Sequence, residues 1–403
     1  MGGFDEDSMR LKCIECGSTY RPDPWLFRCP KCGGLLDVEY RHKIYRLDAR
    51  ERGVWRFKSM LPNPKTRVSL GEGDTPLIEA KSLPVSVKSY IKFEGSNPTG
   101  SFKDRGMAVA VSLAKSMGAK AVIAASTGNT SASASAYAAR AGLKPIVVLP
   151  RGRVARGKLF QAVLHGAFII EVEGSFDVAL ESVIEATGGG SRLFYPVNSF
   201  NPWRLEGQKT LAYEVYSQLG RVPDYVVVPV GNAGNIWAIW KGFKELKDAG
   251  VVDETPVMIG VQAQGAAPIA SMVSRSLEEP LWIDKPETIA TAIRIGRPIN
   301  WRKAVIAIRE SGGTVVAVDD REILEAQRML ARVEGVGVEP ASAASLAGLL
   351  KLDESGYFEY GSHVVMVATG HALKDPEVPL DIEPVRASGL QEVVSLLRGL
   401  IGD

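Results

Sequence analysis

The sequence lacks an excess of charge of either sign. Forty-eight Lys and Arg residues stand against 46 Asp and Glu residues, which leaves a formal net charge of +2 on 403 residues. A balance this even gives no general reason to expect a nucleic acid or an anionic membrane surface as the partner. Binding of either kind would need a local basic patch, and we expect neither.

The sequence also lacks an apolar run that could span a membrane. Its longest notable stretch without charge, residues 121–139, is rich in Ser, Thr, Asn and Gly, which hydrocarbon does not accept. The N-terminal segment MGGFDEDSMR is acidic and has no apolar core followed by a cleavage site, so we expect no secretory signal. With 45% hydrophobic residues, the chain can bury a large core, and we predict a cytoplasmic protein of two or three domains.

Cysteine is absent after position 32. The four cysteines form two CxxC pairs, Cys13 with Cys16 and Cys29 with Cys32. Each CxxC turn can aim two thiolates at one point, and four sulfurs complete a tetrahedral shell, so we predict a zinc ribbon, with iron as the other metal. Two disulfides or four free thiols are the alternatives, and a reducing compartment disfavours the disulfides. The mixed charge of residues 12–40 favours a structural role for the ribbon.

After the ribbon, apolar β-branched runs alternate with amphipathic segments. Runs of this kind are typical of parallel strands buried on both faces, and the intervening segments fit crossover helices. We therefore predict an α/β fold with mostly parallel sheets, divided into two α/β domains. The candidate strands are AVIAA at 121, KPIVVLP at 144, AFIIEVEG at 167, DYVVVPV at 224, PVMIGVQA at 256, GTVVAV at 313 and HVVMVATG at 363.

Ligands of open parallel sheets bind beyond the carboxyl ends of the strands, so the loops there are the candidate binding segments. The segment NPTGSFKDRG, residues 97–106, places Lys103 at the start of a predicted helix. The positive end of the helix dipole would lower the pKa of this lysine and favour the free amine. The alternative is a solvated lysine beside Asp104.

Three further loops follow predicted strands. Residues 126–131, STGNTS, could hold a carboxylate or a ring oxygen at a helix N-terminus, or could simply cap that helix. Residues 231–235, GNAGN, could bring backbone amides to a phosphate, although they match neither GxGxxG nor a P-loop. Thr369 ends the last strand, where a hydroxyl could bond a ring nitrogen without forcing its protonation. We expect the nearby His371 to be a packing or solvent residue.

Taken together, residues 66–380 resemble the fold-type II pyridoxal-phosphate enzymes, the tryptophan synthase β family. The resemblance rests on NPTGSFKDRG, STGNTS, GNAGN and ATGHALKDP in this order. It implies pyridoxal phosphate as cofactor, Lys103 as its Schiff-base lysine and Phe102 as a ring-stacking neighbour. It also implies that Asn129 bonds the ring oxygen, that Thr369 bonds the pyridine nitrogen, and that Gly231, Asn232, Ala233, Gly234 and Asn235 hold the cofactor phosphate.

Within that family, the chain resembles the threonine synthase branch that carries an N-terminal cysteine ribbon. LGEGDTPL at 70, PVNSFNPWRLEGQKT at 196, TIATAIRIGRP at 288 and EPASAASLAGL at 339 are similar to segments of that branch. Cysteine synthases show GTGGT at the phosphate loop and serine/threonine dehydratases GGGGL, whereas this chain has Asn232 and Asn235. The implied reaction converts O-phosphohomoserine and water to L-threonine and phosphate.

The same resemblance implies the residues that bind substrate. Ser126, Thr127 and Thr130 would hold its carboxylate or phosphate, and Asn198, Ser199, Arg204 and Asn232 would surround its phosphate. Arg204 carries a planar fork suited to phosphate oxygens. The alternative for Arg204 is a surface salt bridge with Glu206.

Motif positions suggest the domain boundaries. We predict a zinc ribbon at 1–45, a large cofactor domain from 46–95 and 198–403, and a small domain at 96–197. The family implies a homodimer. The alternatives are a related enzyme that acts on O-phosphoserine, a serine/threonine dehydratase, and a nucleic-acid-binding zinc protein with an inactive enzyme fold.

Overall fold

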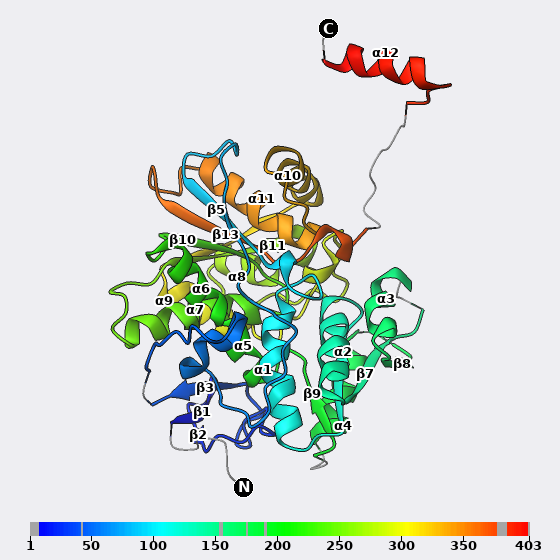
Figure 1. Cartoon of the computed structure of the whole chain (residues 1–403). Coiled ribbons are helices and arrows are strands. Elements are labelled where there is room, and N and C mark those ends of the chain that lie inside the picture. The colour runs from blue at the N-terminus through cyan, green and yellow to red at the C-terminus, as the bar shows by residue number, and fades with distance from the viewer. Residues whose placement is uncertain are drawn as a thin grey trace.

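Three separate β-sheets organise the chain in the computed structural model, which describes residues 8–41, 43–152, 156–174, 176–188, 192–376 and 385–401 (Figure 1). The smallest sheet lies near the N-terminus and is antiparallel, in the order β2-β1-β3. Its strands are β1 (Met9–Cys13), β2 (Thr19–Tyr20) and β3 (Leu36–Tyr40). We call residues 8–41, which contain this sheet and all four cysteines, the ribbon.

The largest sheet has six strands in the order β12-β11-β10-β13-β5-β4. All its pairs are parallel except β4 with β5. The runs predicted at 224, 256, 313 and 363 are confirmed as four of these strands. The strands are β4 (Leu77–Glu79), β5 (Lys88–Phe93), β10 (Tyr225–Pro229), β11 (Val257–Ala263), β12 (Thr314–Val318) and β13 (His363–Ala368).

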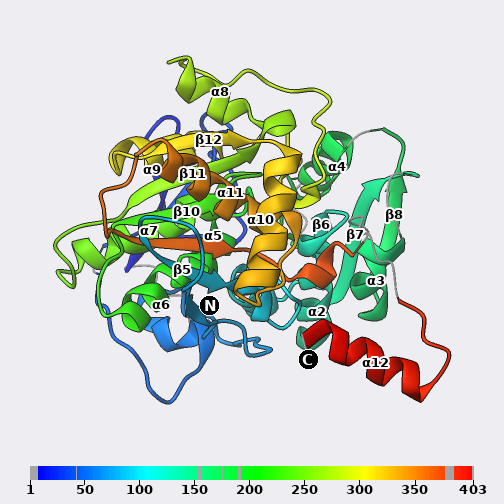
Figure 2. The same cartoon turned by 90° about the horizontal axis from the view of Figure 1, so that it is seen from above.

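Helices cover both faces of this sheet (Figures 1 and 2). Because side chains alternate along a strand, Val226 and Val228 enter one apolar core while Val227 enters the other. One face is covered by α10 (Asp320–Val333) and α11 (Pro340–Glu354). The other is covered by α5 (Pro202–Gln208), α6 (Thr210–Leu219), α7 (Gly234–Asp248), α8 (Pro268–Ser274) and α9 (Trp301–Glu310).

The third sheet has four parallel strands in the order β8-β7-β6-β9. The runs predicted at 121, 144 and 167 are confirmed as three of them. The strands are β6 (Ala121–Ala125), β7 (Lys144–Pro150), β8 (Phe168–Val172) and β9 (Phe194–Pro196). Around this sheet lie α1 (Lys103–Ser116), α2 (Asn129–Ala141), α3 (Arg156–Leu164) and α4 (Phe176–Gly188).

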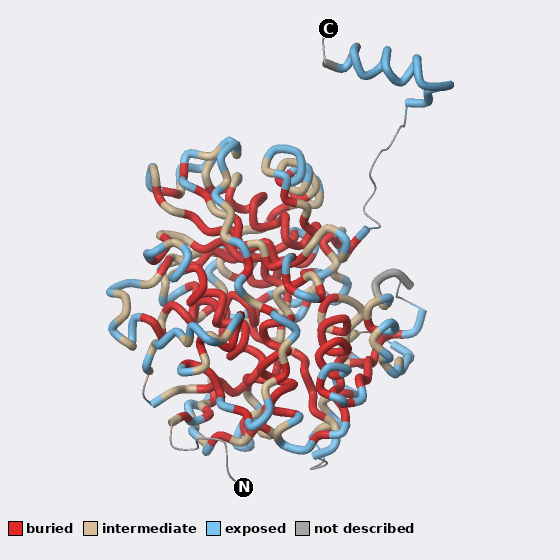
Figure 3. Tube along the Cα trace, in the orientation of Figure 1, coloured by how far each residue is buried: buried red, intermediate tan, exposed pale blue. Residues whose placement is uncertain are grey.

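The sheets draw on separate stretches of chain: strands from 77–93 and 225–368 form the large sheet, and strands from 121–196 form the four-stranded one. The exact domain boundaries stay a prediction. Helix α12 (Leu390–Ile401) stands away from the rest of the molecule and is exposed (Figures 1 and 3). Short 3-10 helices at Gly53–Met60, Glu94–Ser96, Gln264–Ala266, Thr291–Ile293 and Ala372–Lys374 complete the elements.

Among the described helices, none is long and apolar enough to cross a bilayer. The first seven residues, on which the expectation about a secretory signal depends, lie outside the described part of the chain.

Candidate active site

Lys103 is the first residue of α1, as predicted. Its neighbour Asp104 is buried and accepts hydrogen bonds from the Thr99 amide and hydroxyl, both at 2.6 Å, and from the Ser133 hydroxyl. Asp104 is therefore engaged with Thr99 and Ser133, and it is not the partner of Lys103 that the alternative expected. Instead, the Lys103 Nζ lies 3.7 Å from the centre of the Phe102 ring.

The surroundings of Lys103 favour its neutral form. Desolvation and the positive charge of Arg204 together lower the pKa of Lys103 to about 7, although the carboxylate of Glu339 acts in the opposite direction. Above this pH most molecules carry the free amine. A free amine is a nucleophile and a base, whereas an ammonium group is neither.

Asn129 begins α2, directly after the loop at 126–128. Its Nδ2 donates to both carboxylate oxygens of Glu339, at 2.9 and 3.0 Å. Glu339 is buried at the N-terminus of α11, and burial raises the pKa of its carboxyl group. Its carboxylate also occupies the space beside Gly370, where an added Cβ would lie 2.4 Å from Oε1.

The third loop follows β10 and opens α7, as predicted. Ala233 adopts a left-handed conformation with φ 64°, which turns the chain into Gly234, the first residue of the helix. Asn235 is buried, yet within the described part of the chain neither its Nδ2 nor its Oδ1 has a hydrogen-bond partner. Unpaired buried polar atoms are costly. Together with the helix N-terminus, they fit a site for an anionic group of a ligand.

Thr369 follows β13, and its hydroxyl is 2.9 Å from the hydroxyl of Ser342. Its carbonyl accepts a hydrogen bond from the Phe102 amide at 3.0 Å, which joins this loop to the start of α1. His371 accepts a hydrogen bond from the Leu373 amide at 3.1 Å and so caps a short turn. This agrees with the expectation of a structural role for His371.

The polar side chains of the second loop are partly exposed. Ser126, Thr127 and Thr130 are each half-buried. The Ser126 Oγ accepts hydrogen bonds from the amides of Gly128 at 3.2 Å and Ser131 at 3.3 Å. Ser126 therefore contributes to the local turn, as the capping interpretation expects.

Asn198 and Ser199 follow β9. The Asn198 side chain makes two hydrogen bonds with the backbone of Ala125. Its Oδ1 accepts from the Ala125 amide at 2.9 Å, and its Nδ2 donates to the Ala125 carbonyl at 2.8 Å. It thus ties this segment to the end of β6, directly before Ser126. The Ser199 carbonyl accepts from Asn300 Nδ2 at 3.0 Å, and the Asn300 amide donates to the Asn232 carbonyl at 3.1 Å.

Arg204 lies in α5 and is 2% exposed. Its Nη1 donates to the Val197 carbonyl at 2.8 Å, and its buried Nε has no hydrogen-bond partner among the residues that the structure describes. Burial lowers the pKa of Arg204 to about 10. The alternative of a surface salt bridge with Glu206 is wrong, because Glu206 bonds Tyr40, Lys209 and Lys241 instead. Among the described residues, no carboxylate forms an ion pair with Arg204.

These contacts connect the four predicted loops. Phe102 bonds Thr369, the neighbouring Gly370 packs on Glu339, and Glu339 bonds Asn129. Asn198 bonds Ala125 at the end of β6, directly before the second loop, and Asn300 links Ser199 to the third loop. The positive charge of Arg204 lowers the pKa of Lys103 at the start of α1.

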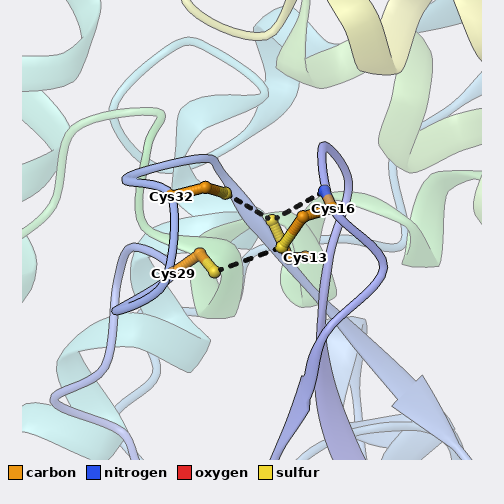
Figure 4. Close-up of side chains that lie close together, drawn as sticks. All are labelled: Cys13, Cys16, Cys29 and Cys32. Carbon is orange, nitrogen blue, oxygen red and sulfur yellow. Dashed lines mark hydrogen bonds between the residues drawn. The ribbon is translucent and has the colours of Figure 1, made fainter.

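The four cysteines form a second cluster. Their sulfur atoms all lie within 4.8 Å of one another, with Cys13 Sγ 3.5 Å from Cys32 Sγ and Cys16 Sγ 3.6 Å from Cys29 Sγ (Figure 4). All four are free thiols. The two disulfides considered as an alternative are therefore not formed, and the donor set fits a tetrahedral metal.

Comparisons with known proteins match this geometry. The profile of the pyridoxal-phosphate dependent enzymes matches residues 68–370. The chain is 50% identical to a threonine synthase of Methanocaldococcus jannaschii over 393 residues, which cover 94% of this chain and 96% of the other. It is 49% identical to a threonine synthase of Methanosarcina acetivorans, with 92% and 94% covered. The chain belongs to the threonine synthase family of pyridoxal-phosphate dependent enzymes.

Solved structures share the fold of this family at low sequence identity. Maize serine racemase is 22% identical with a TM-score of 0.63, and the match covers 81% of this chain and 92% of the racemase. Serine racemase of Dictyostelium discoideum is 21% identical with a TM-score of 0.59, covering 76% and 93%. These likenesses confirm the predicted α/β fold of the pyridoxal-phosphate enzymes.

Sequence reasoning missed two residues of the site, Glu339 and Ser342. Both lie at the start of α11, in the segment EPASAASLAGL, which was noted as similar to the family. No local pattern in that segment marks Glu339 or Ser342, because only the fold brings them to Asn129 and Thr369. The assigned roles of the other site residues stay predictions.

Proposed function

We propose that this chain converts O-phosphohomoserine and water to L-threonine and phosphate with pyridoxal phosphate as cofactor. The observation that carries the proposal is the pair of Lys103 and Arg204. A lysine with a lowered pKa stands beside a buried arginine that has no acidic partner among the described residues. A buried guanidinium without a counter-ion is costly unless a ligand supplies the negative charge.

The residues present fit the cofactor. The amine of Lys103 offers a nucleophile. The side-chain amide of Asn235, which has no partner among the described residues, lies at a helix N-terminus and offers a donor to the phosphate. The hydroxyl of Thr369 offers a neutral partner for the ring. When bound, pyridoxal phosphate supplies an aldehyde and a ring that accepts negative charge from the substrate's α carbon.

The side chains of the chain would then move protons and hold charge. The neutral amine of Lys103 can take the proton from the substrate's α carbon, because its lowered pKa leaves it free near neutral pH. Loss of a second proton, from the β carbon, lets phosphate leave the γ carbon. Arg204 can stabilise the departing dianion through its fork of donors. Proton return to the γ carbon and addition of water at the β carbon give threonine.

Binding of the substrate carboxylate is assigned to Ser126, Thr127 and Thr130. This proposal rests on their half-exposed position at the N-terminus of α2, where backbone amides and hydroxyls can both donate. Ser199 and Asn232, joined through Asn300, are proposed beside the substrate phosphate. Asn198 is proposed to support this group from the Ala125 backbone.

A substrate comparison tests the proposal. Purified enzyme given O-phosphohomoserine should release threonine and inorganic phosphate in equal amounts with no nucleophile other than water. O-phosphoserine offered with sulfide or sulfite is the comparison, because it differs by one methylene. If the enzyme does not convert O-phosphohomoserine and converts only O-phosphoserine, the proposed reaction is wrong and the O-phosphoserine reaction takes its place.

The metal, the assembly and the location complete the proposal. We propose one structural zinc on Cys13, Cys16, Cys29 and Cys32, supported by the clustering of their sulfurs. The family resemblance supports a homodimer, which analytical ultracentrifugation would test. It also supports a cytoplasmic location.

A further inference from the structure

The ribbon contacts the chain segment that carries Arg204. Phe27 of the ribbon packs edge-on against Tyr195 and Phe200, with ring centres 5.4 and 6.2 Å apart. At the end of β3, the Tyr40 hydroxyl donates to Glu206 at 2.7 Å. Strand β3 of the ribbon contacts α5, and in Figure 1 the ribbon lies at the bottom of the molecule, below α5. Residues 195–206 are thus held at both ends by side chains of the ribbon.

Arg204 and Glu206 point to different sides of α5. Two residues along an α-helix are separated by a rotation of about 200°. Arg204 acts on Lys103, whereas Glu206 accepts from Tyr40 of the ribbon and pairs with Lys209 and Lys241. One short helix therefore faces the active site on one side and the ribbon on the other.

The ribbon is also bonded to α7, which begins at the third loop. Asp37 of β3 accepts from Trp237 Nε1 at 2.9 Å and forms an ion pair with Lys241 at 3.0 Å. Lys303 of α9 donates to the Leu36 carbonyl at 2.7 Å. Because these groups are buried, their bonds are strong enough to fix relative positions.

We propose that the ribbon positions Arg204: β3 holds α5 through the Tyr40–Glu206 hydrogen bond and thereby sets the affinity for the substrate's phosphate. Tyr40 is a positioning residue in this proposal and touches no substrate. The proposal rests on the assignment of Arg204 to the substrate phosphate. The alternative is that α1 alone fixes α5, since Gly207 of α5 lies directly against the Arg105 carbonyl.

Tyr40→Phe tests the proposal with little disturbance. It removes the hydroxyl and keeps the ring, which Lys209 Nζ contacts at 4.1 Å. Glu39→Gln is the matched control, because Glu39 is the preceding residue of β3 and pairs with Arg10 and Lys12 at the exposed face of the ribbon. Both variants are compared with the unmodified enzyme carrying cofactor.

The kinetic readout separates positioning from general damage. Tyr40→Phe should raise KM for O-phosphohomoserine roughly 3- to 10-fold, which is less than the full effect of losing a hydrogen bond to a charged group, because Tyr40 acts on the phosphate only through α5. The inhibition constant of inorganic phosphate should rise by the same factor, with kcat, cofactor affinity and visible absorbance unchanged. Glu39→Gln should change none of these. Unchanged KM and phosphate inhibition in Tyr40→Phe, or equal effects in both variants, would overturn the proposal.

Hydrogen exchange keeps this test independent of the reaction. In Tyr40→Phe, amides of residues 195–206 should exchange faster, while those of β6 and β7 should not. If the unmodified enzyme fails to convert O-phosphohomoserine but this exchange pattern appears, the proposed reaction is wrong and the ribbon still positions α5. If residues 195–206 exchange as in the unmodified protein, the ribbon does not hold α5 and the proposal fails.

Discussion

At the scale of single residues, the site places the basic side chains of Lys103 and Arg204 near each other, and no carboxylate of the described residues forms an ion pair with Arg204. The pKa of Lys103 is lowered to about 7, so it loses its proton easily. Arg204 stays charged, and its Nε has no partner among the described residues. The sequence predicted both residues, because each lies in a motif. It did not predict Glu339, since one acid among small apolar residues has no local pattern, and only the fold brings it to Asn129.

The lowered pKa of Lys103 predicts how the cofactor-free protein takes up pyridoxal phosphate. Uptake needs the free amine, so its rate should rise with pH through about 7 and level off above it. Arg204→Gln removes a positive neighbour, so the pKa of Lys103 should rise and the midpoint should move to higher pH. Stopped-flow absorbance at several pH values measures both curves. The same midpoint in the two proteins would show that Arg204 does not act on Lys103.

Arg204→Lys tests the recognition of phosphate. The variant keeps the charge but loses the two-pronged donor, so kcat/KM for O-phosphohomoserine should fall about 10- to 100-fold, corresponding to ~1.5 to 3 kcal/mol. Cofactor content, measured by absorbance after alkaline release, should not change. If the variant lost cofactor together with activity, Arg204 would be assigned to binding of the cofactor and not of the substrate.

At the scale of elements, continuous apolar runs were sufficient to predict seven strands. They failed for β5, whose sequence KSYIKF carries lysines. Lys92 is nevertheless buried, because it pairs with Glu214 at 2.9 Å and donates to the Thr75 carbonyl at 2.7 Å. The sequence of a strand does not show that one of its lysines pairs with a glutamate of a distant helix. The short strands β4 and β9 carry too few residues to show a pattern.

The close contact of α5 with α1 predicts a large effect of a single methyl group. A Cβ on Gly207 would lie 1.9 Å from the Arg105 carbonyl oxygen, so Gly207→Ala must push the two helices apart. Overpacking of this kind costs about 1 to 3 kcal/mol of unfolding free energy. Urea denaturation measures the loss. Gly188→Ala at the exposed end of α4, where no atom of the described residues lies within 4 Å of an added Cβ, is the control and should not destabilise the protein.

At the scale of the whole molecule, the ribbon and both α/β units meet around α5. The ribbon shares an apolar core with α1 and α2 through residues such as Leu11 and Val38. The cysteine spacing predicted the cluster of sulfurs, but not that its sheet would pack beside the active-site helices. Such packing depends on contacts between residues as distant as Asp37 and Trp237.

Metal analysis tests the ribbon. We expect one zinc per chain, lost in Cys13→Ser, because removal of one sulfur opens the tetrahedral shell. Proteolysis should then cut residues 8–41 more rapidly, while the cofactor absorbance stays largely the same. If purified protein contains no metal and has four titratable thiols in the native state, the proposed zinc site is wrong.

The most direct measurement of the proposed reaction follows the oxygen of water. Enzyme, pyridoxal phosphate and O-phosphohomoserine are incubated in water enriched in oxygen-18, and both products are examined by mass spectrometry. If phosphate leaves by cleavage of its bond to the γ carbon and water adds at the β carbon, threonine carries one labelled oxygen and an equal amount of phosphate carries none. Labelled phosphate together with homoserine would mean simple ester hydrolysis and would contradict the proposed reaction.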